Sequence, residues 1–402
     1  MTLLNRLQLT ATAIAFASIP FFPSFITLTN VAFPGVSVVP PPVAIALLCA
    51  MLVLAVVASL ALIQPPRVMP VLVPPLLVWL AAIVLSLVLG LNLRDGTVFV
   101  LIYALTIIWH AHTDRYYTLP GMAQTIWWAY LVSGLLACVV AIAMVVTRTP
   151  AVQYTIANGR AVGTFVLPGE LAGYLLFLLP IAYALARCAR SAALRTIAWV
   201  TLGIGAVTMV LTFSRTGWVG LAAGIAFLIV LQARSGRARF VQGAAIVAAA
   251  VAIVLLLFNE HHNPSENFTR LSIWQAALGV IDRFPLTGVG PFGFSKIYPF
   301  VRLPDGDATA FHAHSMYLTF LAELGIVGFL AFCWVIWCFA REWYRRVHNS
   351  SQTALLASGI AAGVVGALVQ GLIDTVSVVI FGLLVPMLAL ALAAARHGTG
   401  DA

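Results

Sequence analysis

An all-α polytopic membrane protein with about twelve transmembrane helices is the fold class that this sequence predicts. Three observations indicate it. Of the 402 residues, 62% are hydrophobic and only 8% are charged, whereas a soluble domain of this size needs more charge to cover its surface. Apolar runs recur at the length of about 20 residues that crosses a bilayer. The period-two alternation of an outer-membrane barrel is absent from the sequence.

Twelve apolar runs are long enough to be spans. The first follows Arg6 and resembles a signal peptide, but it is long, lacks a small-x-small cleavage site and leads into further spans, so we expect it to be retained. The whole chain, 1–402, is expected to form a single integral membrane domain. In chain order the runs cover residues 8–29, 43–63, 69–90, 97–112, 123–146, 168–186, 196–213, 217–232, 240–258, 314–339, 353–373 and 375–395.

The placement of the basic residues predicts the orientation of the spans. With both termini in the cytoplasm, thirteen of the 21 basic residues lie inside, as the positive-inside rule requires. This distribution argues against nucleic acid as a partner, although the net charge is +9. Basic residues on the outer side oppose the rule and need another explanation; they are Arg94, Arg148, Arg160, Arg215, Arg270, Arg283, Lys296 and Arg302.

The longest connection, residues 259–313, joins the ninth and tenth spans and falls on the outer side. Its central part has apolar residues at helical spacing. Ser265 is expected to cap the start of this helix, and Pro285 to stop it. We expect an amphipathic helix that lies at the membrane surface. Its buried face would consist of Leu271, Trp274, Leu278 and Ile281.

Four segments, each at the outer end of a predicted helix, resemble one known family. They read, in chain order, GRAVGTF–LPGELAGYL, TFSRTGW, RLSIWQAALGVIDRFPLTGVGPFGF and AHSMYLTFLAELGIVG. Together they resemble the O-antigen ligase and polymerase superfamily over roughly residues 155–330. Each segment alone is a weak signal, and the shared order makes it more specific. Within the superfamily, the chain length and the single modest outer loop are most similar to the O-antigen ligases.

The resemblance implies a GT-C-type membrane glycosyltransferase. Such an enzyme moves polysaccharide from undecaprenyl pyrophosphate onto lipid A–core lipopolysaccharide, on the periplasmic face of the bacterial inner membrane. We expect the protein to be a monomer that is surrounded by membrane lipids. The functional arginines of the family fall on Arg215 and Arg270, and its histidine falls on His314. The chain departs from the family in having Ser315 where many relatives have Asn. It also has Glu170 in PGE where relatives tend to have PN, so no catalytic role is assigned to Glu170.

The chemistry of these residues agrees with the implied reaction. Cleavage at the anomeric carbon leaves negative charge on the phosphates, which needs a metal or fixed cations. Because the outer acids are scattered, we expect no metal and no cofactor, and favour Arg215 and Arg270 as the cations. The acceptor hydroxyl needs a base, and His314 suits this role near neutral pH. The outer acids are Asp95, Glu170, Glu260, Glu266, Asp282, Asp305, Asp307 and Asp374.

Each candidate also has a plainer interpretation. Arg215 could anchor a helix end, Arg270 could be a solvated charge on an amphipathic helix, and His314 could cap the tenth span. His312 would point about 200° away from His314 on a helix, so we expect it to be dispensable. Glu323 lies within a span, where an ionisable group is a functional candidate, and we expect it to bind substrate or to pair with an arginine.

Two further functions stay open alongside the ligase. An O-antigen polymerase would share the donor and the motifs, but its acceptor would also be lipid-linked. A polysaccharide or lipid-linked sugar transporter belongs to a different class and predicts internal repeats with broken helices in matching halves. No convincing repeat is visible in the sequence. Arg148 and Arg160, in the outer loop at 147–167, are candidates for guiding phosphates or core sugars in any of these functions.

Overall fold

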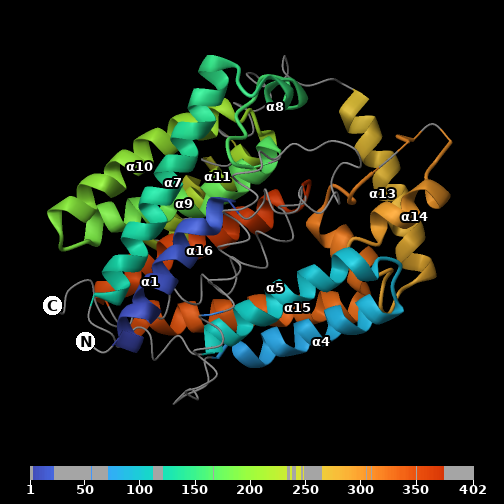
Figure 1. The fold of residues 1–402 in the computed structure, drawn as a ribbon, viewed down its shortest axis with the longest axis horizontal. Coiled ribbons are helices and arrows are strands. Elements are labelled where there is room, and N and C mark those ends of the chain that lie inside the picture. The colour runs from blue at the N-terminus through green and yellow to red at the C-terminus, as the bar shows by residue number, and fades with distance from the viewer. Residues whose placement is uncertain are drawn as a thin grey trace.

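The computed structural model describes most of the chain, and every regular element in the described part is a helix (Figure 1). Three of the predicted spans, 43–63, 240–258 and 375–395, lie largely or wholly outside the described residues, so the count of twelve stays a prediction. The described residues are 3–21, 56, 71–111, 121–165, 167–232, 236–237, 241–245, 248, 265–304, 306–308, 310–349 and 351–374.

Eight predicted spans coincide with long helices of the structure. The first span is only partly confirmed, because α1 starts earlier and ends before residue 29. The elements are α1 (Leu3–Ser18), η1 (Ile19–Phe21), α4 (Val73–Leu89), α5 (Leu93–Ala111), α7 (Met122–Thr147), α8 (Ala151–Ile156), α9 (Pro168–Cys188), α10 (Ala192–Leu211), α11 (Arg215–Gln232), α13 (Ser265–Arg283), α14 (Phe294–Val301), α15 (Met316–Asn349) and α16 (Ser351–Gln370).

Four of the described helices are long and apolar enough to cross a membrane, namely α7, α9, α10 and most of α15. Shorter apolar helices, among them α4, α11 and α16, pack alongside them. The protein is therefore a helical, multi-pass membrane protein. The exposed apolar side chains on the outer helices, such as Val88 and Trp337, are what a lipid-facing surface requires.

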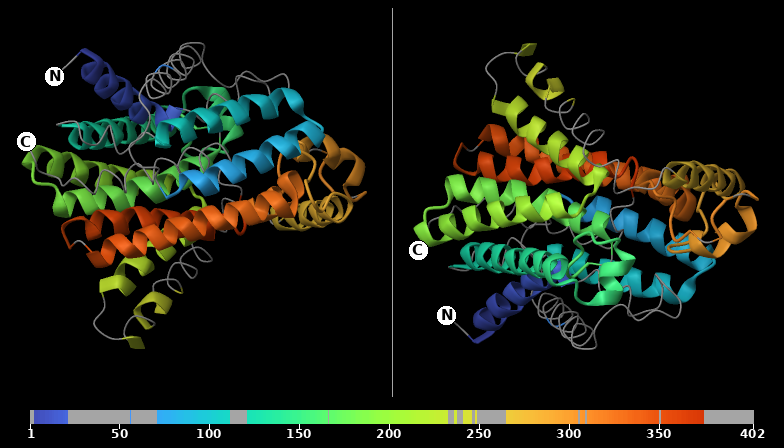
Figure 2. Two further views of the ribbon diagram at one scale, coloured as in Figure 1. Left: turned by 90° about the horizontal axis from the view of Figure 1, so that it is seen from below. Right: turned by 90° about the horizontal axis from the view of Figure 1, so that it is seen from above.

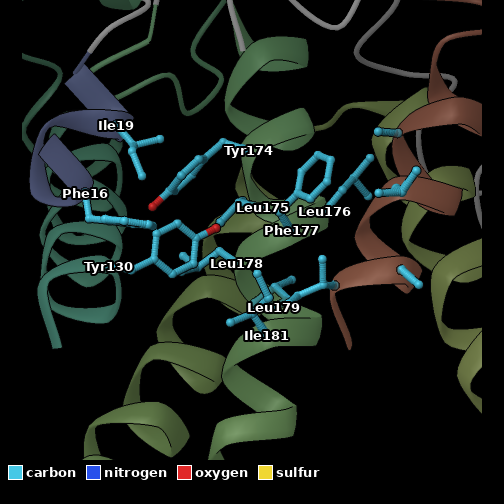
Figure 3. Close-up of a cluster of buried hydrophobic side chains, with 14 of the residues drawn as sticks. Phe16, Ile19, Tyr130, Tyr174, Leu175, Leu176, Phe177, Leu178, Leu179 and Ile181 are labelled. Atoms are coloured by element: carbon cyan, nitrogen blue, oxygen red, sulfur yellow. The ribbon is translucent and has the colours of Figure 1, made fainter. Parts of the chain in front are cut away.

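Helix α9 lies at the centre of the bundle and packs against α10, α11 and α16. Its fully buried Tyr174 and Phe177 belong to a cluster that also takes Phe16 from α1 and Tyr130 from α7 (Figure 3). Helices α11 and α16 approach so closely that a Cβ on Gly220 would lie only 2.7 Å from a carbonyl oxygen of α16. Small residues at a crossing are the usual means of close packing between membrane helices.

Helix α15 is broken at Gly325, which has φ 64° and ψ −173°. The segment at 285–290 inserts at this break: the Val289 N–H donates to the Ala322 carbonyl (3.0 Å), and the Ile326 N–H donates to the Pro285 carbonyl (2.8 Å). A side chain at 325 would collide with the carbonyl of residue 286. This contact holds α13 and α14 at one end of the bundle, beyond the ends of α4, α5 and α15 (Figure 2).

Candidate functional site

The segments that carry the sequence motifs meet at the C-terminal end of α16. We call residues 370–374 the α16 end turn. The side-chain amide of Gln370 donates to the carbonyl of Gly169 at the start of α9 (3.0 Å). The Met316 N–H, which opens α15, donates to the carbonyl of Gly371 (2.8 Å). One short turn thus holds the starts of two helices that are far apart in the sequence.

Arg215 is the first residue of α11, and two hydroxyl groups shape the chain around it. The Thr212 hydroxyl accepts the N–H of Ser214 (3.2 Å), and the Ser214 hydroxyl accepts the N–H of Gly217 (3.2 Å). The second bond caps the helix, because a serine oxygen satisfies a backbone donor of the first turn. Phe213 has a positive φ of 45°, so the chain turns sharply just before Arg215.

Asp374 joins this helix start to the α16 end turn. Its Oδ2 accepts a hydrogen bond from the hydroxyl of Thr216, the residue after Arg215 (3.3 Å). Helix α9 also comes close, since a Cβ on Gly169 would lie 2.6 Å from the same oxygen. Only glycine at 169 therefore permits this carboxylate position. The arrangement places Arg215 one residue from a direct contact with the α16 end turn.

Arg270 reaches the same turn from α13. Its Nη1 donates to the carbonyl of Ile373 (3.2 Å), and the side chain is partly buried. A cation at the C-terminal end of a helix is favourable, because the last carbonyls carry partial negative charge. Arg283, at the far end of α13, is exposed. Arg270 and Arg283 therefore lie at different ends of α13 and in different surroundings.

Helix α13 starts at Ser265 and ends before Pro285, as predicted, although the side chain of Ser265 lies outside the described part. The helix packs on the protein through a different face from the predicted stripe. Leu271 and Leu278 are 54% and 55% exposed, and their burial in a membrane surface stays a prediction. The face that the protein buries has smaller side chains than the predicted stripe; it consists of Ile273, Ala276, Ala277 and Val280.

His314 lies just before α15 and has a positive φ of 47°. The ring of His312 packs edge-on against it, with 4.5 Å between the ring centroids. The His314 N–H also donates to Nδ1 of His312 (3.1 Å). The expectation that His312 points elsewhere is wrong, because the chain before Met316 is not helical and the helical angle does not apply.

The surroundings of His312 favour its neutral form. Burial holds the pKa of His312 well below its usual range, and the nearby His314 and Arg270 lower it further. An unprotonated Nδ1, which the bond from His314 requires, is therefore available at neutral pH. The guanidinium of Arg270 is near enough to lower the pKa of this ring.

Glu323 is 4% exposed and lies just before the break in α15. Its Oε1 accepts the N–H of Phe294 at the start of α14 (3.4 Å), and its backbone carbonyl accepts the N–H of Gly290 (2.9 Å). The expectation of an arginine partner is wrong for the described residues, because the loop inserted at Gly325 supplies backbone donors instead. Glu323 thus holds the loop that carries α14.

The remaining candidates lie near the α7–α9 connection. Arg148 is exposed and ends α7 with φ 55°. Arg160 donates from Nε to the carbonyl of Ala157 (3.2 Å). Glu170 accepts the N–H of Leu167 (3.4 Å), which completes the first turn of α9.

The groups at the α16 end turn can bind an anion and accept a proton. Arg270 supplies a guanidinium, which carries five N–H donors, and Arg215 lies beside the turn. His314 supplies an imidazole. Among the described residues, no group of three His, Cys, Asp or Glu side chains could hold a metal ion. Asp305, one of the two acids that lie close in the sequence, is outside the described part.

Sequence reasoning missed Asp374 and with it the α16 end turn. The sequence shows Asp374 as one of several scattered outer acids. One signal was available: it is a lone acid that stands between two long apolar runs, where an ionisable group is a functional candidate. Its closeness to Thr216, 158 residues away in the chain, depends on helix packing and is not visible in the sequence.

Part of the chain matches a known family. Residues 200–333 match the family described as O-antigen ligase. The match covers about a third of the chain and contains Arg215, Arg270 and His314, and it ends before α16. No curated protein matches the chain.

Proposed function

We propose that the chain is an O-antigen ligase of the bacterial inner membrane, because residues 200–333 match the family described as O-antigen ligase. It transfers polysaccharide from undecaprenyl pyrophosphate to lipid A–core lipopolysaccharide. The observation that carries the proposal is that Arg270, the start of α11 and the start of α15, two residues after His314, all contact the α16 end turn. We propose that this end of the bundle faces the periplasm, and the distribution of basic residues supports that orientation.

Arg215 and Arg270 bind the pyrophosphate of the donor. Guanidinium groups contact phosphate oxygens in pairs, which adds geometry to charge. As the bond to the sugar breaks, negative charge grows on the leaving pyrophosphate, and fixed cations stabilise that charge without reorganisation. The bond to Ile373 uses Nη1 of Arg270 and leaves Nη2 on the same guanidinium for the donor. This reaction needs no divalent metal.

His314 accepts the proton of the acceptor hydroxyl. The hydroxyl oxygen attacks the anomeric carbon, its proton passes to the imidazole, and the bond from that carbon to the pyrophosphate oxygen breaks. Undecaprenyl pyrophosphate leaves, and the configuration at the anomeric carbon is inverted. His314 lies two residues before α15, and His312 accepts its N–H and packs against its ring. This placement supports the role because a base must be correctly placed to act.

Asp374 positions Arg215. Its carboxylate accepts the Thr216 hydroxyl (3.3 Å), and its backbone carbonyl accepts the Met316 N–H (3.2 Å). One residue therefore connects the segment of the proposed cation to the segment of the proposed base. Arg160 and Arg148 are proposed to guide the phosphates or the core sugars toward this site.

An O-antigen polymerase is the second candidate, since it belongs to the same superfamily and would use the same donor. Deletion of the gene in its host, followed by gel analysis of lipopolysaccharide, separates the two. A ligase deletion removes the long-chain ladder while lipid-linked polymer accumulates. A polymerase deletion leaves a core that carries a single repeat unit. An unchanged ladder would refute both.

A further inference from the structure

We propose that His312 is the positioning residue for His314: its Nδ1 holds the backbone of His314 in the conformation that places the His314 imidazole. This inference rests on the proposed role of His314 in glycosyl transfer. His312 lies two residues before the predicted base and is not one of the residues onto which the family resemblance carries a function.

The backbone of His314 needs an external constraint. Its φ of 47° lies in the left-handed region, which residues other than glycine rarely adopt because Cβ crowds the backbone. The hydrogen bond from the His314 N–H to Nδ1 of His312 (3.1 Å) supplies a constraint within the same segment. On the preceding peptide, the Ala313 N–H donates to the Thr319 hydroxyl of α15 (3.3 Å). Two consecutive N–H groups are thus held by side chains.

The ring of His312 also has a fixed place. The ring of Phe311 lies edge-on to it, with 6.0 Å between centroids, and Phe311 in turn packs near Phe292 in the loop that enters the α15 break. The His312 ring also contacts the His314 ring, with 4.5 Å between the centroids and an interplanar angle of 63°. The packing of the His312 ring therefore fixes where its Nδ1 stands relative to His314.

The protonation state agrees with this role. Nδ1 of His312 accepts a hydrogen bond, so in the neutral ring the proton is on Nε2. A doubly protonated ring would present N–H to N–H and lose the bond. Burial, His314 and Arg270 all lower the pKa of His312. The side chain is thereby kept in the form that can hold His314.

Three substitutions at one position separate the possible roles. His312→Asn keeps an acceptor atom at the δ position, where Nδ1 stands. His312→Gln moves the acceptor one bond further out. His312→Phe keeps a ring against His314 and removes the acceptor. If the δ acceptor is what matters, the Asn variant rescues function and the other two do not.

The test uses purified full-length protein, lipid-linked polysaccharide and lipid A–core. We expect His312→Asn to stay within about threefold of wild-type kcat, and His312→Gln and His312→Phe to lose about 10²-fold, the scale of a misplaced catalytic group. The KM for the donor should be unchanged, since Arg215 and Arg270 are intact. Full activity of His312→Phe would overturn the proposal, and so would an Asn variant as inactive as Gln and Phe.

A double substitution shows whether His312 acts through His314. In a His314→Ala background, His312→Phe should cause no further loss in rate, because the group that it positions is gone. A further loss of tenfold or more would mean that His312 contributes independently and would refute the positioning role. High activity of His314→Ala itself would instead overturn the proposed function.

Hydrogen exchange provides a readout that does not depend on transfer activity. The amide of His314 should exchange slowly in wild type and in His312→Asn, and faster in His312→Gln and His312→Phe. Equal protection in all four proteins would refute the hydrogen bond as the constraint, whatever the protein transfers.

Discussion

Nη1 of Arg270 on α13 donates to the carbonyl oxygen of Ile373, which lies 103 residues further along the chain (3.2 Å). This bond fastens α13 to the α16 end turn, beside Asp374 and the start of α15. A charged side chain held there by a helix end can face an anionic donor with the rest of its guanidinium.

The first prediction concerns the two arginines. Arg215→Lys or Arg270→Lys should lower transfer about 10²-fold or more, the usual effect of losing a donor to developing charge, because an ammonium cannot make paired contacts with phosphate. The rate of in-vitro transfer by each variant measures this loss. Arg283→Lys, at the exposed end of the same helix, is the matched control and should be active. Activity should survive EDTA; a requirement for added Mg²⁺ together with two active Lys variants would contradict this prediction.

The second prediction concerns the contact between Asp374 and α9. Gly169→Ala places a Cβ 2.6 Å from the Asp374 carboxylate and should displace this carboxylate. Asp374→Ala removes the carboxylate altogether. Both variants should lower transfer about tenfold or more, since a lost hydrogen bond to a charged group costs about 1.5–3 kcal/mol. Gly203→Ala on α10 is the control, because its Cβ meets nothing within 4 Å. Normal transfer by Gly169→Ala and Asp374→Ala would show that Asp374 does not position Arg215.

The helices themselves could be predicted because hydrophobic length is a local property of the sequence. Spans such as 123–146 and 168–186 match α7 and α9 within two residues at each end. The motif residues were also found correctly as neighbours of helix starts: Arg215 opens α11, and His314 lies two residues before α15.

The remaining parts of the site depend on packing or on local backbone geometry. The partner of Glu323 could not be predicted, because the break at Gly325 lets a loop enter where a continuous helix was expected. The contact of His312 with His314 was missed for a related reason, since the helical angle was applied to residues that are not helical. The role of Asp374 required the relative placement of α9, α11 and α16, which no local pattern contains.

The third prediction tests the break in α15. Gly325→Ala should lower the thermal unfolding temperature, because Gly325 has φ 64° and a side chain there would meet the carbonyl of Leu286. Gly279→Ala in α13 is the matched control. Its Cβ meets nothing within 4 Å, and alanine is favoured over glycine in a helix by about 1 kcal/mol, so this variant should be as stable as wild type or more so. Equal stability of the two variants would show that the break is not required.

The fourth prediction is a pH dependence of stability. Burial, His314 and Arg270 lower the pKa of His312 in the folded protein, whereas the unfolded chain titrates near 6.5. As pH falls below 6.5, the unfolded chain takes up a proton that folded His312 does not, so stability is lost down to the folded pKa. Wild type should therefore lose more stability than His312→Asn between pH 7 and pH 5. Parallel unfolding curves for the two proteins across this range would contradict the lowered pKa.

The last prediction concerns His314 as the base. His314→Ala should reduce transfer by about 10²–10⁴-fold, the usual contribution of a general base, while binding of the donor is retained because both arginines remain. The control is donor binding by the same purified variants, which should fall only when Arg215 or Arg270 is changed. The product of the wild-type enzyme should show inverted configuration at the anomeric carbon, since a single displacement reverses it. Near-normal turnover in His314→Ala, or a product with retained configuration, would show that this histidine does not act as the base of one inverting step.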